Sequence, residues 1–149
     1  GDHRDLHLSI RRQRQMCIRD SPIYDRYISA RHQDGDMYPP SREQFEQFLG
    51  TAWDCTNFLE FRVEGKLIGC AVMDVLPNAL SAIYTYFDPE ESVRSLGTLA
   101  VLFQISLAQQ LGMKSLYLGY WIEDCQKMSY KTNYQPLELL QENTWQMSE

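Results

Sequence analysis

The sequence predicts an α/β (α+β) fold in which a mixed, mostly antiparallel sheet is flanked by helices. Three successive segments have strand-like patterns and are separated by turn residues, which is typical of an antiparallel meander. Directly after them, hydrophobic residues recur at helical spacing from about Ser95 to Leu111. A further strand pattern follows at 114–120. A strand reached through a crossover helix is expected to lie parallel to its neighbour.

Composition and charge narrow the classes of function. The 149 residues are 44% hydrophobic and 23% charged, which suffices for one domain with a core. No apolar run approaches the roughly 20 residues of a membrane helix, and no secretory signal is evident. We therefore expect a cytoplasmic protein with no membrane partner, whose four widely spaced cysteines are reduced. The net charge of −6 disfavours a general nucleic-acid binder, so any nucleic acid is expected on a local patch.

Residues 1–21 differ from the rest of the chain. They carry a net charge of +2, against −8 for residues 22–149, and show neither helical nor strand periodicity. The block QMCIRDS resembles the translated end of a sequencing-library adapter. We expect residues 1–21 to be a disordered, non-native tail without a site, and residues 22–149 to form the domain.

The first elements expected after Pro22 are two helices joined by a loop. IYDRYISARH places Ile23, Tyr27 and Ala30 on one helical face. The loop QDGDMYPP follows, and its two prolines prevent helix continuation. Ser41 then opens a capping box with Gln44, which predicts a helix with a hydrophobic stripe up to Gly50. The stripe consists of Phe45, Phe48 and Leu49.

The strands are expected at 57–63, 66–76 and 80–87, followed by the helix and by strand 114–120. NFLEFRV alternates, KLIGCAVMDVL is apolar enough to be buried on both faces, and LSAIYTYF is rich in β-branched and aromatic residues. IEDCQKMSYKT is expected to form another helix, and LELLQENTWQM a hairpin that turns at Glu142-Asn143.

This order of elements resembles the fold of the GCN5-related N-acetyltransferases. In that fold the fourth and fifth strands, 79–87 and 114–120 in this chain, separate, and an acyl donor lies in the gap. Acetyltransferases that use coenzyme A present a glycine-rich loop before the following helix. The corresponding stretch SVRSLGTLA has one glycine, Gly97, and one arginine, Arg94. A different acyl donor is therefore favoured.

Three stretches make a closer resemblance visible: RHQDGDM, MDVLPNALSAIYTYFDPEESVRSLGT and LYLGYWIEDCQKMSYKTNYQPLELL. Together they resemble the C-terminal domain of the arginyl-tRNA–protein transferase family, and most of all its bacterial aspartate/glutamate leucyltransferase branch in the N-degron pathway. The resemblance implies a cysteine-bearing N-terminal domain, linked to metal or iron–sulfur binding, that this chain lacks. We accordingly expect a truncated chain without a cofactor or metal of its own.

The resemblance implies transfer of an aminoacyl group, leucine, from aminoacyl-tRNA to proteins with an N-terminal Asp or Glu, which marks them for degradation. The alternatives are a coenzyme A-dependent N-acetyltransferase and a non-catalytic module that binds acidic N-termini. An acceptor of this kind brings an ammonium and a carboxylate. Arg31 or His32 is expected to face the carboxylate and Asp34 or Asp36 the ammonium, with Gly35 permitting the bend. A solvated turn and a metal site are the competing interpretations of this loop.

Further candidates lie elsewhere in the chain. Asp74 lies in an apolar strand and, with Asp36, is a candidate catalytic carboxylate, unless it points outward at the strand end or caps the Pro77 turn. Five aromatic residues are candidate substrate-binding residues, although such spacings also suit a core: Tyr27, Tyr84, Tyr86, Tyr120 and Trp121. Four residues are candidates for binding the tRNA end, and the two lysines, four apart, are expected to share a helical face: Arg94, Lys127, Tyr130 and Lys131.

Overall fold

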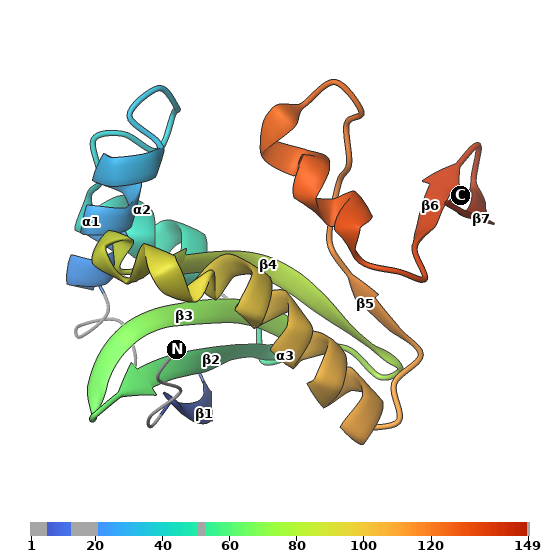
Figure 1. Cartoon of the computed structure of the whole chain (residues 1–149), viewed down its shortest axis with the longest axis horizontal. Coiled ribbons are helices and arrows are strands. Elements are labelled where there is room, and N and C mark those ends of the chain that lie inside the picture. Colours follow the sequence, from blue (N-terminus) through green and yellow to red (C-terminus); the bar gives the residue numbers. More distant parts are fainter. Residues whose placement is uncertain (1–5, 13–20, 51–52, 149) are drawn as a thin grey trace. The chain divides into compact units, whose positions relative to one another are not determined.

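A computed structural model describes residues 6–12, 21–50 and 53–148 of the chain (Figure 1). The chain divides into two compact units, Gly1–Tyr117 and Leu118–Glu149. The sequence predicts one domain over 22–149, and this assignment stays a prediction.

A five-stranded sheet forms the centre of the first unit, in the order β1-β2-β3-β4-β5. The strands are β1 (Leu6–Arg12), β2 (Thr56–Val63), β3 (Lys66–Val75), β4 (Ala79–Phe87) and β5 (Ser115–Tyr117). The first four are antiparallel to their neighbours, and β5 runs parallel to β4. The predicted meander and parallel fifth strand are confirmed, although β5 is shorter than the predicted 114–120.

Two hydrophobic layers cover opposite faces of this sheet (Figure 1). On one face, α1 (Ser21–Arg31), α2 (Arg42–Phe45) and the π-helical turn η2 (Glu46–Gly50) pack on β2, β3 and β4. On the other face lies α3 (Leu96–Gln110), which follows the short 3₁₀ segment η3 (Pro89–Arg94). The mixed sheet flanked by helices is therefore confirmed.

Local sequence explains most of these elements. In β2, Phe58 packs on the α1 face while Leu59 and Phe61 pack on the α3 face, as the alternation predicts. The β2–β3 hairpin turns at Glu64 and Gly65, whose φ angles of 49° and 81° are those of a type I′ turn. The predicted cap of α2 is confirmed, because the Gln44 backbone N–H donates to Ser41 Oγ at 3.1 Å.

The stripe of the second helix differs from the prediction at Phe48. Phe45 and Leu49 are buried as expected, but Phe48 is 47% exposed. A π-turn takes more residues than the 3.6 of an α-helical turn. Leu49 therefore follows Phe45 on the buried side, and Phe48 turns away from it.

Two further predictions about the N-terminal part of the chain are wrong. Leu6–Arg12 forms β1 and pairs with β2, although no regular element was expected within residues 1–21. Leu6, Leu8 and Ile10 alternate with other residues as in a strand, and the pairing of this segment satisfies the backbone groups at the edge of β2. The native or adapter origin of residues 1–21 stays a prediction, and residues 1–5 and 13–20 lie outside the described residues. In α1 the fully buried side chains are Tyr24 and Ile28, whereas Ala30 is exposed.

The second unit contains a 3₁₀ segment, η4 (Gln126–Asn133), and the hairpin of β6 (Glu138–Gln141) and β7 (Thr144–Met147). The hairpin is confirmed, and Glu142 and Asn143 have the positive φ angles of its turn. The helix predicted over 122–132 is corrected to the 3₁₀ segment. A 3₁₀ helix has three residues per turn, so residues four apart do not share a face. The expectation that Lys127 and Lys131 share one is therefore wrong.

We predict that Asp88→Asn lowers the free energy of unfolding by about 1–3 kcal/mol, because it weakens charge-assisted hydrogen bonds to a buried carboxylate. Asp88, at the end of β4, accepts from Arg26 Nη2 of α1 at 2.8 Å and lies 3.6 Å from Lys66 Nζ. Urea denaturation measures the change, with the exposed Glu90→Gln as the matched control. Equal stabilities of the two variants would contradict this role of Asp88.

Candidate functional site

The pairing between β4 and β5 ends after three residues. Ala79, Leu80 and Ser81 pair with Ser115–Tyr117. From Ala82 to Phe87, β4 keeps β3 on one side and has no strand on its other side within the described ranges. The two strands therefore part at Ser81, as the predicted fold requires.

A β-bulge lies immediately beyond this point. The register between β3 and β4 passes from Met73–Ala82 to Val72–Tyr84, which leaves Ile83 without a partner residue on β3. Bulges often occur beside active sites, where they redirect a side chain or free a backbone group. Sequence analysis missed Ile83, because a bulge has no reliable signature in a run of β-branched and aromatic residues.

Helix α1 brings the mixed-charge bend 31–37 to the parted half of β4. The ring of Tyr27 lies 4.9 Å from the Phe87 ring and 6.2 Å from the Tyr84 ring. Arg31 Cζ lies 5.4 Å from the centre of the Phe87 ring, and Tyr84 Oη donates to Met37 Sδ at 3.8 Å. The bend is thus attached to the strand residues that β5 no longer covers.

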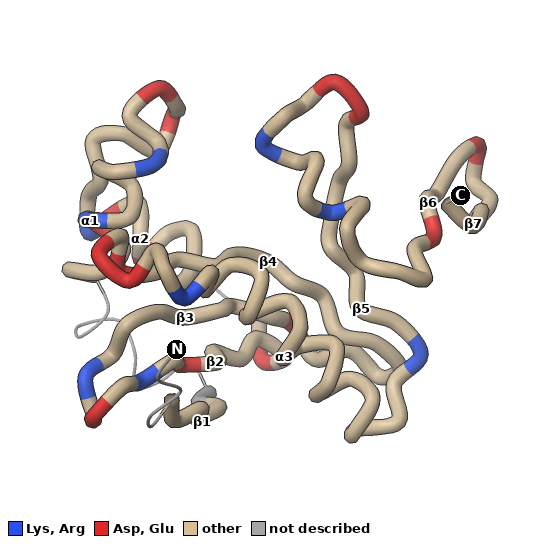
Figure 2. Tube along the Cα trace, in the orientation of Figure 1, with Lys and Arg blue, Asp and Glu red and all other residues tan. Residues whose placement is uncertain are grey.

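The bend carries both charge signs (Figure 2). Its backbone turns through two hydrogen bonds: Gly35 N–H donates to His32 O, and Tyr38 N–H donates to Gly35 O, both at 3.1 Å. The φ of Gly35 lies outside the left-handed region, and a Cβ there would make only an ordinary 3.7 Å contact. The bend therefore does not require glycine at this position, which corrects the expectation for Gly35.

The histidine of the bend packs against an aromatic ring, since His32 lies 5.4 Å from the Tyr27 ring. Within the described part of the chain, no three His, Cys, Asp or Glu side chains are grouped in a way that would hold a metal ion. The bend therefore offers a ligand charged and hydrogen-bonding groups. Its residue Asp34 is exposed.

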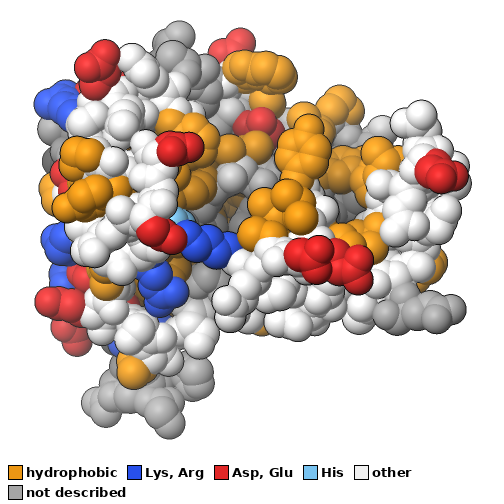
Figure 3. Space-filling view, turned by 90° about the horizontal axis from the view of Figure 1, so that it is seen from above, with side chains coloured by type: hydrophobic (Ala, Val, Ile, Leu, Met, Phe, Trp, Pro, Cys, Tyr) orange, Lys and Arg blue, Asp and Glu red, His pale blue; other side chains and the backbone are white. Residues whose placement is uncertain are grey.

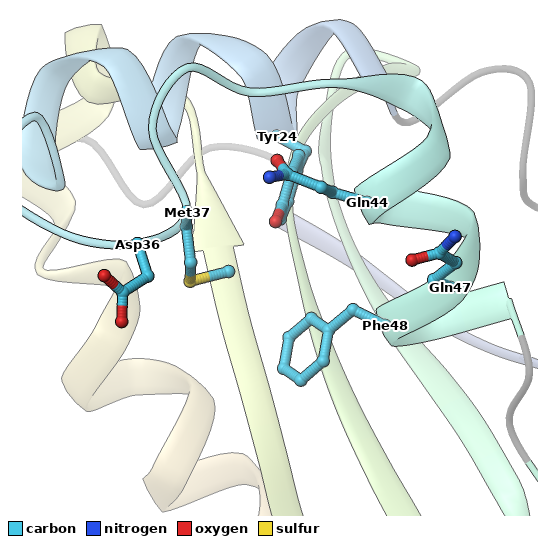
Figure 4. Close-up of a pocket in the computed structure, with 6 residues that line it drawn as sticks. All are labelled: Tyr24, Asp36, Met37, Gln44, Gln47 and Phe48. Carbon is cyan, nitrogen blue, oxygen red and sulfur yellow. The ribbon is translucent and has the colours of Figure 1, made fainter.

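The first cavity, of about 360 Å³, lies between the bend and α2 (Figure 4). Asp36 and Met37 of the bend line it on one side, and Gln44, Gln47 and Phe48 on the other. The hydroxyl of the fully buried Tyr24 points into this space, and neither it nor Gln44 Oε1 has a hydrogen-bond partner among the described residues. The cavity therefore presents polar atoms that a ligand with N–H groups can satisfy.

The second cavity, of about 240 Å³, contains Asp74. This carboxylate is half-buried and accepts a hydrogen bond from Thr56 Oγ1 of β2, so it does not face bulk solvent. Thr56 also lines the cavity, and the remaining lining residues are hydrophobic: Phe48, Leu49, Trp53, Val72 and Ile83. Phe48 lines both cavities, which places them next to each other.

The two candidate tyrosines of β4 occupy different environments. Tyr86 is fully buried in contact with Tyr24 and Phe45, so the structure places it in the core. Tyr84 is half-buried and contacts the rings of Tyr27 and Phe48. Burial raises the pKa of the Tyr84 phenol, and the neighbouring tyrosines add to the increase.

The stretch before α3 holds Arg94 and Gly97. Arg94 Nε is 2.7 Å from Glu91 Oε2, so this arginine is already paired with a carboxylate. Gly97 lies in the first turn of α3 and has an unstrained backbone. A single glycine and a neutralised arginine make a poor pyrophosphate cradle, in agreement with the sequence.

The remaining candidates belong to the second unit. Tyr120 is 89% exposed, and Trp121 is half-buried. Lys131 Nζ donates to Tyr120 O, and desolvation lowers the pKa of Lys131. Burial raises the pKa of Tyr130, while Lys127 is exposed.

The face shown in Figure 3 has many exposed hydrophobic side chains, with charged side chains among them. None of the helices described is long and apolar enough to cross a membrane.

Comparison with known proteins identifies relatives. Residues 19–141 match the family described as "Arginine-tRNA-protein transferase, C terminus". Over 123 residues the chain is 55% identical to a protein of Pseudomonas fluorescens (strain Pf0-1) and 56% identical to one of Stutzerimonas stutzeri (strain A1501), both called "Aspartate/glutamate leucyltransferase". The match covers 83% of this chain and 52% of each relative, so the chain spans about half the length of these relatives.

Solved structures show the fold. A ribosomal-protein-alanine N-acetyltransferase from Brucella melitensis has a TM-score of 0.59 at 14% identity, covering 88% of this chain and 89% of its own. A possible acetyltransferase from Clostridium difficile 630 has a TM-score of 0.63 at 9% identity, covering 86% of this chain and 88% of its own. The predicted acetyltransferase-like fold is confirmed, and identities this low carry the fold alone.

We predict that Tyr84→Phe makes the stability of the protein less dependent on pH above about 10. The folded-state pKa of Tyr84 is raised above the unfolded value of about 10, so the folded state retains a proton that the unfolded state loses. The stabilisation is present below about pH 10 and is lost as pH rises. Urea denaturation between about pH 9 and 11.5 measures how the free energy of unfolding falls with pH. This fall should be smaller in Tyr84→Phe than in wild type, by up to about 1.4 kcal/mol per pH unit.

The control is Tyr38→Phe, at an exposed position that makes no ring contact in the described structure. If the free energy of unfolding depends on pH equally in wild type, Tyr84→Phe and Tyr38→Phe, the assignment of a buried, neutral phenol to Tyr84 is wrong.

Proposed function

Because the chain belongs to the arginine-tRNA-protein transferase family, in the C-terminal part of that family's sequence, we propose that it carries an aminoacyl-transfer site. The reaction is transfer of leucine from aminoacyl-tRNA to the α-amine of proteins that begin with Asp or Glu. The observation that carries this proposal is the position of the mixed-charge bend against the half of β4 that β5 leaves uncovered.

The two charged groups of the acceptor match the two charge signs in the bend. Its α-ammonium is a donor for Asp36, which lines the first cavity. The Tyr24 hydroxyl and the Gln44 oxygen beside it have no hydrogen-bond partner in the described part of the chain. Its side-chain carboxylate is an acceptor for Arg31 or His32. Asp34 does not line this cavity, so Asp36 is the better candidate of the two aspartates.

The transfer step requires the acceptor nitrogen to lose two protons and the tRNA ribose to depart. An α-amine has a pKa of about 8, so a neighbouring carboxylate that removes the first proton from the ammonium yields a nucleophile near neutral pH. Nitrogen then bonds to the ester carbonyl carbon, the carbon–oxygen bond to the tRNA ribose breaks, and the departing ribose oxygen takes up the second proton from that nitrogen and becomes a hydroxyl. The oxyanion formed in between needs a donor, and the backbone freed at Ile83 is the candidate.

The partners follow from this reaction. They are aminoacyl-tRNA as co-substrate and proteins with acidic N-termini, which leucine would mark for degradation, in the cytoplasm. Arg94, Lys127, Tyr130 and Lys131 are the candidates for the tRNA end. No resident cofactor or metal is proposed for this chain.

We predict that the chain transfers labelled leucine from charged tRNA to a peptide that begins with Asp, and not to one that begins with Gly. The full-length Pseudomonas fluorescens relative, assayed in parallel, verifies the substrates. Asp36→Asn should reduce transfer by roughly 100-fold or more, because it removes the base. Asp34→Asn makes the same charge change in the same loop and should stay within a few-fold of wild type.

Absence of transfer by the chain, while the relative is active, would contradict the proposal that these residues suffice for catalysis. Equal losses in the two variants would contradict the assignment of Asp36.

We also predict no saturable binding of coenzyme A by calorimetry, because the stretch before α3 lacks a pyrophosphate cradle. Saturable binding would instead favour an N-acetyltransferase. Binding of Asp-initiated peptides without any leucine transfer would favour a non-catalytic module.

A further inference from the structure

The second cavity combines one carboxylate with hydrophobic walls. Among the described residues that line it, Asp74 of β3 is the charged one, and Thr56 Oγ1 donates to its Oδ1. An ionised carboxylate has about four acceptor sites, so most of the hydrogen-bonding capacity of Asp74 is still available. A group that brings several N–H donors and one positive charge, such as an ammonium, is the best complement for it.

The walls of this cavity are incompletely covered. Two of its lining residues, Leu49 and Val72, are buried. The other three hydrophobic ones are not: Phe48 is 47%, Ile83 42% and Trp53 76% exposed. Exposed hydrophobic side chains gathered around one concavity mark a binding site, because a ligand that covers them gains about 25 cal/mol per Å² of buried apolar surface.

The size and place of the cavity restrict the ligand further. About 240 Å³ is less than the roughly 300–1,000 Å³ of pockets for drug-sized ligands, and suits a group as small as one amino acid. Ile83, at the bulge where β4 has just parted from β5, lines it. Phe48 separates it from the first cavity, where we place the acceptor.

We propose that this second cavity binds the aminoacyl group of the donor, with the α-ammonium of leucine on Asp74 and its branched side chain on Val72, Leu49 and Ile83. This inference rests on the proposed function and adds the site of the second substrate. It gives Asp74 a binding role in place of the general-base role that the sequence suggests. An arginyl group would bring a second cation, and the described lining residues of the cavity include no second carboxylate for it.

The test uses L-leucinamide, which has the α-ammonium, the isobutyl group and a carbonyl like that of the ester. Its binding to the whole chain is followed by NMR titration. Three further probes dissect the contacts: 4-methylpentanamide lacks the ammonium, glycinamide lacks the side chain, and L-argininamide replaces the apolar side chain by a cationic one.

Leucinamide should bind saturably and at least tenfold more tightly than each of the other three probes. Asp74→Asn keeps the shape of the side chain and should weaken leucinamide binding about tenfold without weakening 4-methylpentanamide. Ile83→Ala should weaken both several-fold. Glu64→Gln removes the same charge at the exposed β2–β3 turn, at the other end of β3, and should bind as wild type does.

The proposal is overturned if leucinamide does not bind saturably, or if neither Asp74→Asn nor Ile83→Ala changes its affinity. Because Ile83 is partly exposed, its variant keeps the test valid even if Asp74→Asn does not fold. Failure of the proposed function is distinguishable from this result. Leucinamide binding that depends on Asp74, in a chain that transfers no leucine, would contradict the transfer reaction and support the binding site.

Discussion

The separation of β4 from β5 after Ser81 is the constraint on which the rest of the candidate site depends. It leaves Ala82–Phe87 with a strand on one side only among the described residues, at the position where the bulge frees Ile83. Ring contacts with Tyr27 and the sulfur contact of Met37 then attach α1 and the bend to that part of the strand. If β5 continued to pair with β4 beyond Ser81, its backbone would occupy the edge of β4 where the substrates are proposed to meet.

Phe48 connects this part of β4 to the two cavities. The π-turn of η2 rotates it off the buried stripe, so that its ring packs on Tyr84 and forms part of both walls. Each cavity contains one carboxylate, Asp36 or Asp74. The proposed reaction brings two amines, one on the acceptor and one on the donor. A separate carboxylate for each amine lets one be held as an ammonium while the other loses its proton.

Much of the fold was predictable from the sequence, but the finer features of the site were not. Alternation, turn residues and helical spacing located β2, β3, β4, α3 and the β6–β7 hairpin, because these patterns record which face is buried. The π-turn at Phe48 and the bulge at Ile83 depend on tertiary packing, which a local pattern does not contain. For the same reason, the sequence offered Asp34 and Asp36 alike as partners of the ammonium, whereas in the structure Asp36 is the one that lines the first cavity.

The most direct test of the central claim, that bend 31–37 beside β4 binds acidic N-termini, is an NMR titration of the chain with ¹³C-methyl-labelled methionine. Met37→Leu assigns the Met37 signal. Peptides that begin with Asp should shift this signal saturably, because Met37 lines the first cavity and contacts Tyr84. Peptides of the same sequence that begin with Gly should not. If both peptides shift the Met37 signal equally, or neither does, the bend is not the acceptor site.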